Sequence, residues 1–163
     1  MEKIKRMELL APAGDMQSAR AAFSAGADAC YIGGSFSARA YAANFAKEEM
    51  LALIEYAHLR GKRVHAAINI MLKQSEVPRA LEEAAFLYEA GVDAIIASDL
   101  GFIAQAHRLF PGLPIHASTQ MGVQDAAGAR PVSYTHLHDA GHPLPGQQYR
   151  LLDSGCAVRI YHQ

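Results

Sequence analysis

The sequence of 163 residues has no tryptophan, only two cysteines and a net charge of −1. Cys30 and Cys156 form neither a CxxC pair nor a disulfide framework, which excludes the small folds that disulfides hold together. The near-zero charge provides no overall basic field of the kind that favours nucleic acids. No apolar stretch is long enough for a signal peptide or a membrane span. These absences predict a cytoplasmic protein that makes no membrane contact.

The sequence also lacks the short motifs that identify common enzyme classes. It contains no GxGxxG, no P-loop, no HExxH and no GxSxG. Hydrophobic residues make up 51% of the chain and charged residues 19%, which is the composition of an ordinary globular domain with a buried core. The fold class therefore has to come from the periodicity of the chain.

A five-residue phrase occurs twice and divides the chain into repeating units. Residues 25–29 and residues 90–94 each follow an amphipathic segment and precede a short apolar one, and a looser copy lies at Arg60 and Gly61. Each unit is one helix followed by one strand, and repetition of such units favours a parallel (β/α) barrel. A complete (β/α)₈ barrel needs about 250 residues. We therefore predict an α/β fold with the first five βα units of an incomplete TIM-like barrel.

Capping and turn signals predict where the elements begin and end. Asp15 caps a helix that runs to about Ala25, and Gly26 ends it in the left-handed conformation. Further helices are predicted at about 47–60, 76–90 and 99–110. The helix predicted at 76–90 is expected to bury Leu81, Ala85 and Tyr88. The five strands are predicted to end near Ala11, Ile32, Ile68, Ala97 and Ala117.

Two of the predicted strands alternate between apolar and polar residues. In the strand predicted at 115–120, His116, Ser118 and Gln120 share one face, and His65 and Asn69 share the corresponding face of the third strand. In a (β/α) barrel one strand face meets the helices and the other meets the lumen. Asn69, Ser118 and Gln120 are therefore expected at the C-terminal mouth of the barrel, where barrel enzymes keep their active sites.

The periodicity ends at about residue 129. Residues 131–137 resemble the conceptual translation of a transposon end sequence used to fragment DNA for sequencing libraries, and no helical or strand period follows. We predict that 1–129 form the N-terminal part of a barrel and that 130–163 are an unrelated tail, either an assembly artefact or disordered. The tail contains His136, His138 and His142, with Cys156 and His162 further along the chain. Their spacing is only loosely that of zinc ligands, and we predict no metal site.

Three blocks of residues carry a family resemblance. Residues 7–15 (Met-Glu-Leu-Leu-Ala-Pro-Ala-Gly-Asp), residues 26–40 and residues 116–121 (His-Ala-Ser-Thr-Gln-Met) resemble the N-terminal region of the collagenase-like peptidases of unassigned catalytic type, peptidase family U32. The resemblance covers about Met7 to Ala129. It implies that the chain is a fragment of a peptidase, with peptide as substrate.

The same resemblance implies an alternative activity. Other members resemble proteins that hydroxylate tRNA or rRNA bases or ubiquinone precursors, and these hold an iron–sulfur cluster. The family's cysteine-bearing signature lies in its C-terminal half, and no residue of this chain matches it. We therefore expect no cofactor in this fragment, a cluster in the missing half, and an inactive fragment. A non-catalytic scaffold is a further alternative.

Two candidate binding residues follow the second predicted strand. Arg39 and Asn44 match the family's pattern and can clamp an anionic or amide group, because arginine presents a rigid fork of donors. The alternative for Arg39 is a salt bridge with a neighbouring loop. The preceding residues 33–35 (Gly-Gly-Ser) can present backbone N–H groups to a phosphate, although many tight βα turns share this sequence.

The remaining candidates each have a structural alternative. Asn69 is either a ligand contact or a residue that fixes a loop, and Asp99 is either a general base or a helix N-cap. His116 and Ser118 point the same way but lack an orienting third group, so an interior structural role competes with catalysis. Gln120 can contact a substrate through its amide. We assign no catalytic residue from the sequence.

Overall fold

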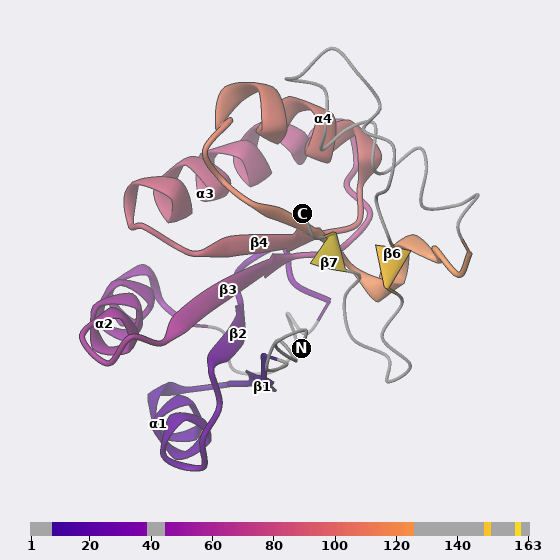
Figure 1. The fold of residues 1–163 in the computed structure, drawn as a ribbon. Coiled ribbons are helices and arrows are strands. Elements are labelled where there is room, and N and C mark those ends of the chain that lie inside the picture. Colours follow the sequence, from indigo (N-terminus) through magenta and orange to yellow (C-terminus); the bar gives the residue numbers. More distant parts are fainter. Residues whose placement is uncertain (1–7, 39–44, 126–148, 151–158, 161–163) are drawn as a thin grey trace.

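The computed structural model describes residues 8–38, 45–125, 149–150 and 159–160. Five strands alternate with four helices in the first 117 residues (Figure 1). The strands are β1 (Leu10–Pro12), β2 (Ala29–Gly33), β3 (Arg63–Ile68), β4 (Ala94–Ala97) and β5 (Ile115–Ala117). The helices are α1 (Met16–Ser24), α2 (Lys47–His58), α3 (Val77–Glu89) and α4 (Leu100–Leu109). A short 3₁₀ helix, η1 (Thr119–Met121), follows β5, and β6 (Tyr149–Arg150) pairs antiparallel with β7 (Arg159–Ile160).

The five strands form one parallel sheet in the order β1-β2-β3-β4-β5. The order equals the sequence order, and the helices lie along one side of the curved sheet (Figure 1). This arrangement of consecutive βα units is the predicted α/β architecture, and the predicted strand ends agree with the observed ones to within one residue. Among the described residues no helix is long and apolar enough to cross a membrane.

The repeated phrase has a physical basis in the structure. Gly26 and Gly91 adopt φ values of 101° and 78°, a left-handed conformation that glycine adopts without a Cβ penalty. The aspartate two residues later ties the new strand to its neighbour. Asp28 Oδ2 accepts a hydrogen bond from the backbone N–H of Leu9 at 2.9 Å, and Asp93 Oδ2 accepts one from Val64 at 2.8 Å. Each copy therefore ends a helix and sets the register of a strand pair.

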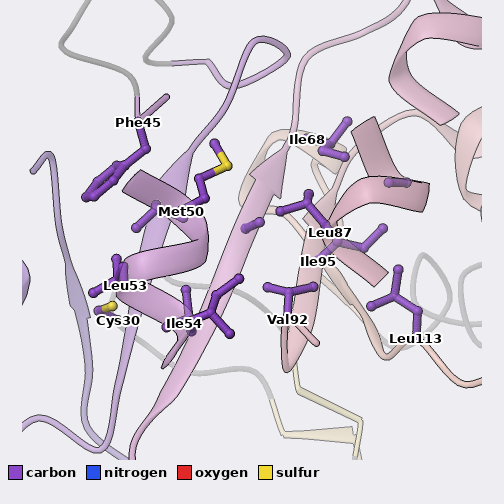
Figure 2. Close-up of a cluster of buried hydrophobic side chains, with 14 of the residues drawn as sticks. Cys30, Phe45, Met50, Leu53, Ile54, Ile68, Leu87, Val92, Ile95 and Leu113 are labelled. Atoms are coloured by element: carbon purple, nitrogen blue, oxygen red, sulfur yellow. The ribbon is translucent and has the colours of Figure 1, made fainter. Parts of the chain in front are cut away.

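The hydrophobic core lies between the sheet and the helices (Figure 2). Leu53 of α2 packs near Cys30 of β2, and Leu87 of α3 lies beside Ile95 of β4 (Figure 2). All four side chains are fully buried. Burying an aliphatic side chain of this size stabilises a fold by about 1.5 to 3 kcal/mol, so this layer holds the strand ends in place.

The structure corrects two details of the prediction. In α3 the buried stripe is Val77, Ala80, Ala84 and Leu87, whereas Tyr88 is 43% exposed. Small alanine side chains let α3 approach the sheet closely, and the Tyr88 ring packs instead on Phe110, with 5.6 Å between ring centroids. The alternation expected to continue to Gln120 stops after Ala117, where β5 ends, because Ser118 caps η1 and turns the chain. The predicted boundary at residues 129 and 130 lies outside the described residues.

Candidate functional site

A belt of polar side chains links the C-terminal ends of three strands. Asn69 follows β3, Ser98 follows β4 and Ser118 follows β5, and parallel strands bring their carboxyl ends to one edge. Ser98 Oγ donates to the backbone carbonyl of Asn69 at 3.1 Å, and Asn69 Nδ2 donates to Ser118 Oγ at 3.4 Å. The predicted convergence of Asn69 and Ser118 at the mouth is therefore present. Sequence reasoning missed Ser98, although it follows β4 as Asn69 follows β3.

Asn69 also holds the loop that follows β2. Its Oδ1 accepts a hydrogen bond from the backbone N–H of Ala38 at 2.9 Å, and its own backbone N–H donates to the carbonyl of Phe36 at 3.0 Å. Both the side chain and the backbone of Asn69 therefore fix the loop, as the structural interpretation of this residue predicts. The half-buried amide still lies at the mouth, so a contact between Asn69 and a substrate stays a prediction.

Asp99 is the N-cap of α4. One carboxylate oxygen accepts a hydrogen bond from the backbone N–H of Phe102 at 2.8 Å, and the other accepts one from Leu72 at 3.3 Å. A carboxylate at a helix N-terminus accepts a hydrogen bond from an N–H group that has no partner within the helix. It also interacts favourably with the positive end of the helix dipole. Of the two interpretations of Asp99, the geometry therefore favours the cap.

Ser118 is buried, with 5% exposure, and its hydroxyl oxygen accepts a hydrogen bond from the backbone N–H of Gln120 at 3.2 Å. It is the N-cap of η1, so its hydroxyl serves the turn after β5. Gln120 lies in η1 with an exposed side chain and does not continue the lumen-facing alternation of the strand. Its predicted contact with a substrate would therefore be made from the turn.

Deeper in the lumen, two histidines and an ion pair gather. The rings of His65 and His116 meet edge to face, 4.9 Å apart between centroids. Burial, and secondly the neighbouring His116, lowers the pKa of His65 to about 4, and burial also lowers the pKa of His116. Both rings are therefore neutral at neutral pH. Arg63 forms an ion pair with Glu8 at 3.0 Å.

This cluster belongs to the floor of the lumen. Glu8 Oε1 lies 3.9 Å from His65 Nε2, while no hydrogen bond joins His116 to Ser118 in the part of the chain that the structure describes. Sequence reasoning missed Glu8 and Arg63. The signal for Arg63 was available, because it lies two residues before His65 and therefore on the same strand face.

Several candidates lie outside the described residues. These are Arg39, Asn44, Cys156 and the four histidines of the tail, His136, His138, His142 and His162. Cys30 faces the helices from inside the core, and burial raises the pKa of its thiol to about 12, which makes it a poor ligand or nucleophile. Over residues 8–38 and 45–125, no three histidine, cysteine or carboxylate side chains are arranged to hold a metal ion.

Comparison with known sequences places the chain among longer proteins. Peptidase family U32 matches residues 14–137. The chain is 38% identical over 125 residues to "Uncharacterized protease MJ0090" of Methanocaldococcus jannaschii, covering 76% of this chain and 30% of that protein. It is 38% identical over 126 residues to the 23S rRNA 5-hydroxycytidine C2501 synthase of Escherichia coli, covering 77% of this chain and 19% of the relative.

A third relative is the tRNA hydroxylation protein P of Escherichia coli, 29% identical over 169 residues and covering 94% of this chain and 37% of that protein. The chain thus spans between about a fifth and two fifths of the length of these relatives. The match to the family continues past residue 129, and the boundary that we predict there stays a prediction.

Comparison of structures gives the same fold. The U32 peptidase Mk0906 superposes with a TM-score of 0.63 at 13% identity, covering 83% of this chain and 58% of that structure. The HMG-CoA lyase from Brucella melitensis superposes with a TM-score of 0.53 at 18% identity, covering 78% and 54%. At this level of identity the superpositions establish the TIM-barrel fold and carry no statement about activity.

Proposed function

This chain belongs to peptidase family U32, and we propose that it is the N-terminal part of a barrel protein required for hydroxylation of RNA bases. The observation that carries the proposal is the set of relatives. The rRNA hydroxycytidine synthase matches at the same identity as the uncharacterised protease, and a tRNA hydroxylation protein matches across nearly the whole chain. Hydroxylation therefore takes precedence over proteolysis, which was our first expectation from the sequence.

The side chains at the mouth of the lumen also favour hydroxylation over proteolysis. Ser118 is the candidate nucleophile at the mouth, and its hydroxyl oxygen accepts hydrogen bonds from a backbone amide and from Asn69. The ring of His116 packs against His65 instead of Ser118. A serine peptidase needs a base hydrogen-bonded to its nucleophile and a third group that orients the base. Among residues 8–38 and 45–125, His116 and Ser118 do not form this arrangement.

The polar groups at the mouth suit recognition of a nucleobase. The buried hydroxyls of Ser98 and Ser118 are hydrogen-bonded within the mouth, whereas the half-buried Asn69 and the exposed Gln120 provide amide groups without a net charge. Such groups form hydrogen bonds with the edges of a base that is held out of its stack, while the phosphates are bound elsewhere. We propose that the mouth contacts the base and that Arg39 and Asn44, by their place in the sequence, extend this contact to an anionic or amide group.

The described residues do not fit the iron–sulfur cluster that the family resemblance implies. A cluster requires several thiolates, whereas residues 8–38 and 45–125 contain one cysteine, Cys30, which is buried among the core side chains that face the helices. We derive no chemical step through a cluster. We propose that any such group is bound by parts of the intact protein beyond the described residues.

A chimaera tests the proposal directly. The segment of the Escherichia coli tRNA hydroxylation protein that aligns with residues 14–125 is replaced by this chain, and the chimaera is expressed in a strain that lacks the native protein. Mass spectrometry of tRNA nucleosides should show recovery of the hydroxylated nucleoside, heavier than its precursor by one oxygen atom. A soluble chimaera that restores no hydroxylation, together with cleavage of gelatin by the intact protein of this chain, would reverse the order of the two activities.

A further inference from the structure

One face of α3 contacts the loop that follows β2. Arg79, Glu83 and Phe86 recur at spacings of four and three residues, so they lie on one face of the helix. The guanidinium of Arg79 lies 5.8 Å from the ring centroid of Phe36 in the loop. The ammonium group of Lys47, at the start of α2, lies 4.9 Å from the ring centroid of Phe86. This face therefore meets both the loop and the helix that follows it.

The carboxyl group of Glu83 lies in the space that a side chain on residue 34 would occupy. A Cβ atom on Gly34 would collide with Glu83 Oε1 and would lie 3.3 Å from Met50 Cε. The backbone of Gly34 lies outside the left-handed region, unlike that of Gly26 and Gly91. A side chain at this position would therefore displace the ends of Glu83 and Met50 without straining the backbone.

The carboxyl group of Glu83 sits in an unusual environment for an acid on the surface of a helix. Its Oε1 is buried and has no hydrogen-bond partner. Hydrogen bonding from the hydroxyl and the backbone N–H of Ser35 in the loop favours the ionised carboxylate. The positive charges of Lys47 in α2 and Arg79 in α3 favour it as well. A buried oxygen without a hydrogen-bond partner destabilises the folded protein, so its presence calls for an explanation.

We propose that Glu83 is a positioning residue that clamps the loop of residues 34–38 against α3, and that Gly34 is glycine in order to admit its carboxyl group. The loop is thereby attached on two sides. Glu83 holds residues 34 and 35 from the helix layer, while Asn69 binds Phe36 and Ala38 from the end of β3. The assignment is independent of the reaction that the intact protein performs.

The clamp has a dependence on protonation with a defined sign. Burial raises the pKa of Glu83 above its ordinary value, although Ser35, Lys47 and Arg79 oppose the shift. A carboxyl with a raised pKa in the folded protein is bound more favourably in its neutral form. As the pH rises through this pKa, the group ionises against the cost of burial. The attachment of the loop is therefore expected to weaken from acid towards neutral and alkaline pH.

Hydrogen exchange of the intact protein that contains this chain tests the proposal. Glu83→Ala and Gly34→Ala should lower the protection factors of peptides covering residues 33–38 by about tenfold, while peptides from α4 keep theirs. Glu83→Gln retains the shape of the side chain but does not titrate. It should keep the loop protected and remove the loss of protection that the unmodified protein shows as the pH rises above 4.5, the ordinary pKa of a glutamate.

Glu82→Ala is the matched control, because this exposed glutamate precedes Glu83 on the same helix. It should leave the exchange of residues 33–38 unchanged. Unaltered protection in both Glu83→Ala and Gly34→Ala would overturn the clamp. The same pH response in Glu83→Gln and in the unmodified protein would overturn its dependence on protonation. Neither outcome depends on RNA hydroxylation, so the two proposals can fail separately.

Discussion

The two faces of the sheet differ in what their side chains do. The face that meets the helices carries Cys30, Val64, Ile68 and Ile95, all fully buried and all apolar. The opposite face carries charged and polar groups, among them Arg63, His65, Asn69 and Ser118. Because side chains alternate along a strand, the same strands supply both sets through successive residues. Stability is thus concentrated on one face and polar chemistry on the other.

The open edges of the sheet are a liability when the barrel is incomplete. The sheet ends at β1 and β5, which leaves two strand edges without a strand partner in the described part of the chain. Such edges pair with other chains, and a closed barrel avoids this by having no edges. The 163-residue chain expressed alone should therefore aggregate and show no activity. Size-exclusion chromatography of the chain with and without residues 130–163 checks this.

A stable monomer of either form would show that five units suffice for folding. If that monomer also bound iron stoichiometrically or cleaved a collagen-like peptide, the view of the chain as an inactive fragment would be wrong.

On the helix-facing side of the sheet, truncating a buried side chain should mainly lower the stability of the fold. Leu53→Ala removes a fully buried side chain from α2 and should lower the free energy of unfolding by about 2 to 5 kcal/mol. Leu51→Ala, on the same helix but with 45% exposure, serves as the control and should cost about 1 kcal/mol or less. Urea denaturation of the intact protein measures both. Equal losses would contradict the packing that assigns Leu53 to the core.

On the lumen side, acid should destabilise the protein through His65. Its pKa in the folded protein, about 4, lies below the unfolded value of 6.5, so the unfolded state binds the proton more readily. The contribution of neutral His65 to the free energy of unfolding is therefore fully present above about pH 6.5. It is lost as the pH falls through about 4. The shift corresponds to roughly 3 kcal/mol at most.

The substitution His65→Gln removes this titration while keeping a polar side chain in the lumen. Urea unfolding at neutral pH and near pH 4 should show a smaller loss in the variant than in the unmodified protein. His58→Gln is the control, because His58 is largely exposed and pairs with Asp93 on the outside of the sheet. A loss in His65→Gln as large as in the unmodified protein would show that His65 does not titrate as its burial implies.

The sequence predicted the features that neighbouring residues determine. The strand ends and the cap at Asp15 follow from glycines, capping residues and apolar runs within a few positions of each other. The convergence of Asn69 and Ser118 follows from strand alternation combined with a parallel sheet. These predictions needed no knowledge of the tertiary packing.

Features that join distant segments were not predictable in this way. Glu83 meets Gly34 across 49 residues, and Glu8 meets Arg63 across 55, so no local pattern marks either contact. The stripe of α3 was ambiguous because two adjacent faces of that helix are apolar, and only the sheet decides which of them is buried. Gln120 was misplaced because alternation cannot show that Ser118 turns the chain.

The smallest expected effect on stability belongs to the mouth, and it tests the central claim most directly. Asn69→Ala in the chimaera removes the hydrogen bonds to Ala38 and Ser118 and should cost roughly 1 kcal/mol, a shift of a few degrees in melting temperature. Gln120→Ala should change it still less. The hydroxylated nucleoside in tRNA, measured by mass spectrometry at equal levels of soluble protein, should fall strongly in Asn69→Ala. Unchanged hydroxylation in both variants would contradict the account and leave these residues with structural roles alone.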